Sequence, residues 1–211
     1  MATVPAVCVF CSSSLLIDER YSALAHDVGA AIARRGWTLV SGAGSISMMG
    51  AVARAARAGG GHTIGVIPDA LVAMEVADHD SDEFVVTRDM RQRKGIMDER
   101  SDAFLALPGG IGTLEELVEA WTARSLNMHH KPVVVLDPWG DFDLLRAQVA
   151  AWQERGFVSD HAAERVHWAT DVLAGWCTGA AWLLMCVTVR GVWRRTVGGL
   201  PASVAAVPAR P

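Results

Sequence analysis

The stretch Ala-Phe-Leu-Ala-Leu-Pro-Gly-Gly-Ile-Gly-Thr-Leu-Glu-Glu, residues 103–116, decides the fold. Its first five residues form a short apolar run, which predicts a buried strand. A glycine-rich turn, residues 108–113, follows directly. After the turn, apolar residues recur at helical spacing: Leu114, Leu117, Val118 and Trp121. A strand, a tight turn and a helix in direct succession are the repeating unit of α/β proteins with a parallel sheet.

The same alternation runs through residues 1–171. Further strands are predicted at residues 4–10, 37–40, 64–67, 84–86 and 133–136, and helices at residues 18–35 and 46–58. Strands separated by helices imply right-handed crossovers and a buried parallel sheet. The sequence therefore predicts the α/β class, with a Rossmann-like, doubly wound parallel sheet and helices on both faces. Ligands of such sheets bind at the carboxyl ends of the strands.

Composition and charge exclude some classes of function. The chain has 211 residues, 51% of them hydrophobic, and a net charge of -4, so no sequence-wide basic field exists for nucleic acid. The four cysteines form two distant pairs, and the N-terminus lacks the basic-then-apolar layout of a secretory signal. We therefore expect a cytoplasmic protein without a nucleic-acid partner.

Residues 172–211 differ from the rest of the chain because they contain no Asp, Glu or Lys. Residues 172–189 are uncharged and precede Arg190, which meets the lower length limit for a membrane-spanning helix with a basic flank. Gly175 and Gly179 within this stretch disfavour a membrane helix without excluding it. A membrane anchor, a buried or interface helix, and an added tail remain open. We expect one domain over residues 1–171 and an atypical apolar, acid-free tail over residues 172–211.

The glycine-rich turn at residues 108–113 suits an anion. Glycines let backbone amides approach a ligand closely, and a helix start adds unpaired donors and the positive end of the helix dipole. This predicts a phosphate cradle, and a plain strand-to-helix turn is the alternative. No lysine follows the last glycine, so the turn is not a Walker loop.

Glu116 has two interpretations. Thr113 followed three residues later by Glu116 has the spacing of a capping box, in which the glutamate only returns a hydrogen bond to the backbone. A carboxylate beside a phosphate site could instead orient a water molecule or stabilise a cationic sugar during glycosyl transfer. Spacing alone favours the cap.

Two further segments lie at predicted strand ends. Residues 42–50 form a second glycine-rich turn, which alone is weak evidence for a ligand. Asp89 is a plausible N-cap for a helix that opens with Arg91, Arg93 and Lys94. These basic residues suit either a solvated helix face or a group of side chains directed at a phosphate or sugar.

Three segments resemble a known family. Residues 108–116 match the PGGxGTxxE signature of the Lonely Guy (LOG) phosphoribohydrolases, which activate cytokinins, and residues 90–94 match their MxxRK segment. Residues 8–13, Cys-Val-Phe-Cys-Ser-Ser, look like the first strand and turn of that family. Together with residues 78–80 and 131–132, they extend the resemblance over roughly residues 4–171.

The resemblance implies hydrolysis of the N-glycosidic bond in adenosine 5′-monophosphate (AMP) or an N6-modified AMP. The products would be a free adenine or cytokinin base and ribose 5-phosphate. The family uses no cofactor or metal and forms dimers or larger assemblies, so a homodimer is expected. The resemblance assigns catalysis to Arg93 and Glu116. It assigns substrate contacts to Glu75, Arg93, Lys94, Gly110, Ile111, Gly112, Thr113, Leu114, Glu115, Glu116 and Thr122.

The sequence departs from the family at the second glycine-rich turn. The family usually reads GGGxxGxMG there, and Ala43 and Ser47 replace two of the glycines. We expect their side chains to add bulk near the pocket and so to affect which base is accepted.

Two other functions compete with this interpretation. Members of the family have often been called lysine decarboxylases, but pyridoxal phosphate chemistry needs a Schiff-base lysine, and the chain has only Lys94 and Lys131. The second alternative is a non-catalytic nucleotide or molybdenum-cofactor carrier of related fold. The presence of both Arg93 and Glu116 favours the enzyme.

Overall fold

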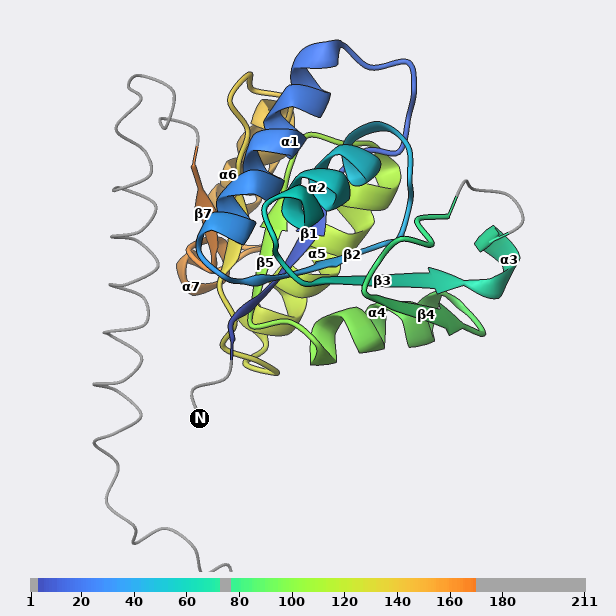
Figure 1. The fold of residues 1–211 in the computed structure, drawn as a ribbon. Helices are drawn as coiled ribbons and strands as arrows, with labels where there is room; N and C mark the ends of the chain where they lie inside the picture. The colour runs from blue at the N-terminus through green and yellow to red at the C-terminus, as the bar shows by residue number, and fades with distance from the viewer. Residues whose placement is uncertain (1–3, 73–76, 170–211) are drawn as a thin grey trace, which may run out of the picture. The chain divides into compact units, whose positions relative to one another are not determined.

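The structure is a computed structural model, which describes residues 4–72 and 77–169 (Figure 1). Its strands are β1 Ala6–Phe10, β2 Thr38–Ser41, β3 Thr63–Pro68, β4 Glu83–Thr87, β5 Ala103–Ala106, β6 Val133–Val135 and β7 Val166–Trp168. Its helices are α1 Glu19–Arg34, α2 Ser47–Ala58, α3 Asp69–Val72, α4 Met90–Glu99, α5 Ile111–Ser125, α6 Asp143–Glu154 and α7 Asp160–Ala163.

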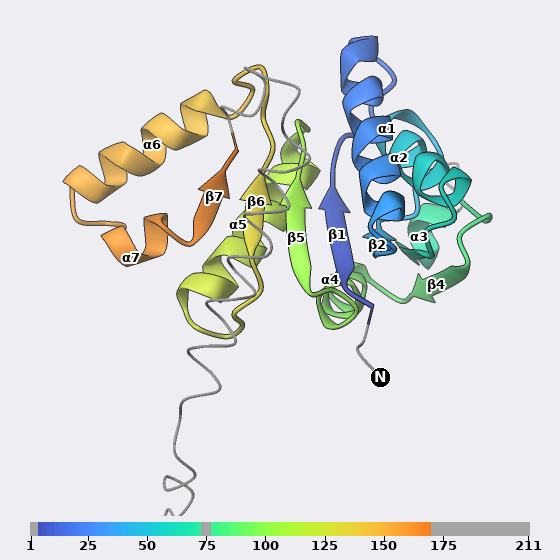
Figure 2. The ribbon, with the colours of Figure 1, turned by 60° about the vertical axis from the view of Figure 1, so that its left-hand side comes forward.

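Within the described residues the strands form one parallel sheet in the order β4-β3-β2-β1-β5-β6-β7. This confirms the predicted doubly wound α/β fold. From β1 the chain builds the sheet outward to β4, then returns to place β5 beside β1, with Val7 opposite Ala103 and Phe10 opposite Ala106 (Figure 2). The direction of winding therefore reverses between β1 and β5. Ligands of this fold bind where it reverses.

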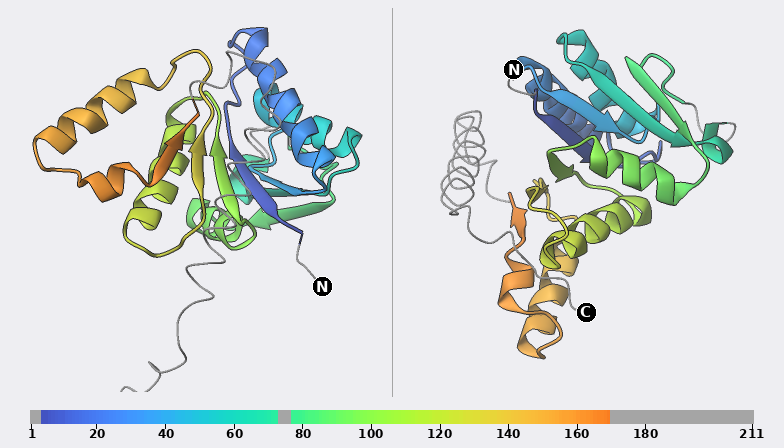
Figure 3. Two further views of the ribbon diagram at one scale, coloured as in Figure 1. Left: turned by 90° about the vertical axis from the view of Figure 1, so that its left-hand side faces the viewer. Right: turned by 90° about the horizontal axis from the view of Figure 1, so that it is seen from below.

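Helices cover both faces of the sheet. α1 and α2 pack together on one face, and α4 and α5 lie on the other (Figure 3). Successive side chains of a strand point to opposite faces, so Cys8 and Phe10 join the core formed with Leu117 and Trp121 of α5. Every residue of β1 is buried, as a strand covered on both faces requires.

Most element boundaries follow local signals. Asp18 caps α1 by accepting a hydrogen bond from the Arg20 amide at 2.9 Å, as the predicted start at residue 18 requires. The first strand begins at Ala6, two residues later than predicted, where the Ala6 amide donates to the Asp102 carboxylate at 2.8 Å. Strand β7 and helices α3, α6 and α7 were not predicted.

Some expectations concern residues outside the described ranges. Glu75 and the tail of residues 172–211 are among them, and the domain boundary near residue 171 stays a prediction. Among the helices that the structure does describe, none has the length and apolar character needed to span a membrane.

Candidate active site

The start of α5 presents open hydrogen-bond donors at the carboxyl end of β5. Gly110 is the N-cap, has an extended backbone and offers no side-chain cap, and its carbonyl accepts from the Leu114 amide at 3.0 Å. The amides of Ile111, Gly112 and Thr113 therefore have no acceptor within the helix. Gly110, Ile111 and Gly112 are exposed, so this positive end of the dipole is accessible to an anion.

The capping-box interpretation of Thr113 and Glu116 is wrong. The helix begins at Ile111, so Thr113 is its third residue and not its N-cap. The Thr113 side chain is buried against Gly109, where an added Cβ would lie 2.2 Å from the threonine Oγ1. Glu116 is thus free of the backbone cap and available to another partner.

That partner is Arg93, which α4 places opposite α5. Asp89 caps α4 as predicted, accepting from the Gln92 amide at 2.8 Å. Arg93 is only 8% exposed, and its Nη1 donates to Glu116 Oε1 at 2.8 Å. Its Nε donates to the Val66 carbonyl of β3 at 3.1 Å. The two predicted catalytic residues therefore form one buried ion pair that connects β3, α4 and α5.

Burial controls the electrostatics of this pair. Removal from water raises the pKa of Glu116 above its ordinary value, and the charge and hydrogen bond of Arg93 only partly oppose the rise. Burial, followed by the nearby Glu116 carboxylate, also raises the thiol pKa of Cys8 and of Cys11. Both cysteines are free thiols that stay protonated at neutral pH, which does not suit a nucleophile.

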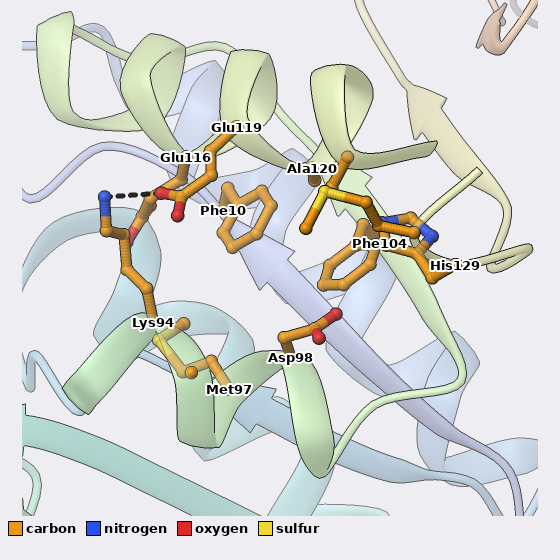
Figure 4. Close-up of a pocket in the computed structure, with 12 residues that line it drawn as sticks. Phe10, Lys94, Met97, Asp98, Phe104, Glu116, Glu119, Ala120 and His129 are labelled. Carbon is orange, nitrogen blue, oxygen red and sulfur yellow. Dashed lines mark ion pairs between the residues drawn. The ribbon is translucent and has the colours of Figure 1, made fainter. Parts of the chain in front are cut away.

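Lys94 is engaged by acidic side chains of α5. Its Nζ pairs with Glu115 and with Glu119, and the hydrogen bond to Glu115 is the largest cause of its raised pKa. Figure 4 shows Lys94 beside Glu116 and Glu119. The structure thus brings the predicted contact residues Lys94 and Glu115 together, but it pairs them with each other. Glu119, which contacts Lys94 one turn further along α5, was not predicted.

A cavity of about 200 Å³ lies between α4 and α5 beside this pair (Figure 4). Its apolar lining includes Phe10, Met97, Phe104 and Ala120. Glu116 lines the same cavity, so it lies between Arg93 and a space whose wall is mainly apolar. The polar side chains of that wall are Lys94, Asp98, Glu119 and His129. Sequence patterns identified the two aromatic residues only as parts of strands.

Thr122 lies away from the ion pair. It is exposed on the outer side of α5, in a shallow groove that it shares with Ile111, Leu114 and Val118. Neither Arg93 nor Glu116 lines that groove.

The two departures from the family's second glycine-rich turn act on the backbone. Ala43 has φ 57° and Ser47 has φ 52°, the left-handed region that favours glycine. The Ala43 side chain is fully buried against Ile67 and Ala77, so the expected bulk near the pocket is wrong for this residue. The Ser47 hydroxyl donates to the Ser14 carbonyl at 2.6 Å.

Fold and site define a Rossmann-like α/β protein whose glycine-rich helix start lies beside a buried Arg–Glu pair. Residues 49–174 match the family model described as "Possible lysine decarboxylase". The chain is 57% identical over 160 residues to the cytokinin riboside 5′-monophosphate phosphoribohydrolase of Mycobacterium tuberculosis, covering 76% of this chain and 85% of the relative. It is 43% identical over 158 residues to the Arabidopsis thaliana enzyme LOG3, covering 75% of this chain and 74% of the relative. The chain belongs to this LOG family.

Solved structures show the same fold. The molybdenum cofactor carrier protein of Chlamydomonas reinhardtii superposes with a TM-score of 0.64 at 24% identity, covering 90% of this chain and 99% of the carrier. A molybdenum cofactor binding protein from Rippkaea orientalis gives 0.64 at 22% identity, with 89% and 99% covered.

The lysines do not suit the decarboxylase description of the family model. Lys94 is held by Glu115 and Glu119. The Nζ of Lys131 donates to the Asp98 carbonyl at 2.6 Å and to its carboxylate at 2.9 Å. A Schiff base needs a neutral amine, and carboxylate partners favour the charged ammonium.

Proposed function

We propose that the chain hydrolyses the N-glycosidic bond of AMP or an N6-modified AMP, releasing the base and ribose 5-phosphate. The observation that carries this proposal is the buried pair of Arg93 and Glu116 close to the open start of α5. The printed names of the relatives support the same reaction. Glycosidic hydrolysis needs a carboxylate near the anomeric carbon and a means of holding the rest of the substrate.

The 5′-phosphate is assigned to the start of α5. The free amides of Ile111, Gly112 and Thr113 would donate hydrogen bonds to its oxygens, with Gly110 as the open cap. Holding the phosphate also fixes the ribose. The binding energy of the phosphate is then used to orient the anomeric carbon, although the phosphate is remote from the bond that breaks. The substrate contacts of Lys94, Leu114 and Glu115 remain part of this proposal, as does that of Glu75, outside the described residues.

Glu116 is assigned the reacting centre. As the bond from C1′ to the base breaks, the electron pair leaves with the base and positive charge develops on the ribose. The Glu116 carboxylate would stabilise that charge and orient a water molecule, whose oxygen bonds to C1′. The water's proton is transferred to the carboxylate or to solvent, and the base gains a proton from solvent. Arg93 would keep the carboxylate ionised and in place.

The apolar cavity beside Glu116 bears on the choice of base. Its lining of Phe10, Met97 and Phe104 would favour an apolar N6 substituent over bulk water. Comparing AMP with N6-isopentenyl-AMP measures this preference directly.

A cytoplasmic homodimer is the proposed state of the protein. Ile111 is 87% exposed and Met128 is 75% exposed, and both line the groove on α5 with Val118. An apolar helix face of this kind suits a self-complementary contact with a second copy across a two-fold axis. Thr122 lies in the same groove, so its proposed substrate contact and the proposed subunit contact share that groove.

The test is chromatographic detection of free base after incubation with AMP and, separately, with N6-isopentenyl-AMP. Glu116→Gln is the control, because it keeps the shape and removes the charge. We expect release by the wild type and loss of release in the variant, with nucleotide binding measured by calorimetry largely retained. Binding without release by the wild type would contradict the enzyme and favour the carrier.

A further inference from the structure

Gly42 lies against the guanidinium of Arg93. It follows β2 directly and opens the second glycine-rich turn. A Cβ added at Gly42 would lie 2.1 Å from Arg93 Nη2 and 3.2 Å from Arg93 Cζ. The φ of Gly42 is not in the left-handed region, so an alanine is compatible with its backbone. What the structure requires at Gly42 is therefore the absence of a side chain.

The guanidinium is confined on three sides. Its Nε is held by the Val66 carbonyl at 3.1 Å, and its Nη1 by Glu116 at 2.8 Å. Its Nη2 edge lies over Gly42. Because a guanidinium is a rigid plane, it cannot withdraw from Gly42 without disturbing at least one of the other two contacts.

We propose that Gly42 is a positioning residue that sets where Arg93 stands relative to Glu116. The catalytic part of this inference rests on the proposed function. The backbone of the second glycine-rich turn then holds the Arg93 side chain in position for its ion pair with Glu116. The sequence singled out that turn only as a possible approach for a ligand.

Gly42→Ala is the direct perturbation. Restoring an ordinary contact requires the guanidinium to move by about 1 Å, and a misplacement of that size can reduce turnover by as much as about 100-fold. We expect kcat for AMP to fall by about 10- to 100-fold with a smaller change in KM. Arg93 lowers the Glu116 pKa, so its displacement should raise that pKa and move the acidic limb of the pH profile of kcat to higher pH.

Gly61→Ala is the matched control. Its Cβ would lie 3.1 Å from the Ala33 Cβ and 3.1 Å from the Ala56 carbonyl oxygen, so it also introduces a crowded alanine. Its crowded neighbours are in α1 and α2, and Arg93 is not among them. We expect an unchanged pH profile in this variant.

A double variant isolates the contact. Lysine has neither Cζ nor Nη2, so Gly42→Ala should have little further effect when added to Arg93→Lys. The pKa of the Glu116 carboxyl, measured by carbon-13 NMR, is the readout for this cycle because it does not depend on turnover. If Gly42→Ala alone does not fold, recovery of folding in the double variant supports the contact, and failure of both variants overturns it.

The outcomes separate the two proposals. An unchanged Glu116 pKa in Gly42→Ala would overturn the role of Gly42, as would an equal effect of Gly42→Ala in the Arg93→Lys background. Absence of base release by the wild type would overturn the proposed function, while the NMR titration would still decide the role of Gly42.

Discussion

Removing Arg93 should destabilise the protein in a pH-dependent manner. Arg93→Met keeps a long apolar side chain and deletes the cation, which leaves the Glu116 carboxylate, 11% exposed, without its partner. Two unit charges about 4 Å apart gain about 4 kcal/mol at an effective dielectric constant of 20. Removing one partner of a buried pair costs about 3–5 kcal/mol. For a domain of this size that corresponds to a fall in Tm of about 6–20 °C.

The sign of the pH dependence follows from Glu116. Its pKa is already raised in the folded state, and loss of Arg93 raises it further. A carboxyl with a raised folded pKa contributes stability below its unfolded pKa, and that stability is lost as the pH rises through the folded pKa. The loss in Arg93→Met relative to wild type should therefore be larger at pH 8 than at pH 5.

Urea unfolding followed by tryptophan fluorescence at both pH values measures these differences. The double variant Arg93→Met, Glu116→Gln removes both charges, so it should be more stable at pH 8 than Arg93→Met alone. A loss that is equal at pH 5 and pH 8, together with a double variant as unstable as the sum of the single variants, would refute the reasoning.

Three further outcomes are expected. The acidic limb of kcat/KM for AMP should lie above the ordinary glutamate pKa of 4.5, because burial raises the pKa of Glu116. A limb at or below 4.5 in the pH profile would contradict the assignment. Ser47→Gly should be more stable than Ser47→Ala by about 1 kcal/mol in urea unfolding, since only glycine relieves the left-handed φ and both lose the hydroxyl. Val118→Asp should lower the mass found by light scattering to that of a monomer, whereas Leu144→Asp, exposed on α6, should leave a dimer.

The fold could be predicted largely because buried parallel strands are continuous apolar runs. The run at residues 133–136, for example, became β6. Strand β7 was not predicted because Val166–Trp168 has only three residues and contains a histidine. Its pairing with β6, Val133 opposite Val166, is a tertiary contact that no local pattern encodes.

The site was only partly predictable. The family motifs named Arg93 and Glu116, but spacing along the chain could not show that they meet. The capping-box error has a local cause. Threonine and glycine are about equally favoured as N-caps, so the Thr-x-x-Glu spacing could not show that Gly110, with its extended backbone, is the N-cap and that the helix begins at Ile111. Once the helix begins there, Thr113 is inside it and the Glu116 side chain is left to pair with Arg93.

The strained turn after β2 is held from outside. The left-handed Ala43 persists although it lacks glycine's freedom, and such strain survives only where the surroundings determine the conformation. The Ala43 carbonyl accepts from the Asp78 amide at 2.8 Å, and Arg57 grips the Asp78 carboxylate with contacts of 2.7 and 2.9 Å. Asp78 is 4% exposed, so this buried bidentate ion pair, called the anchor below, holds the Asp78 backbone in place. By fixing Ala43, the anchor also fixes the adjacent Gly42 against Arg93. The geometry of the catalytic ion pair therefore depends on a second ion pair, Arg57 with Asp78, neither of which was predicted as a site residue.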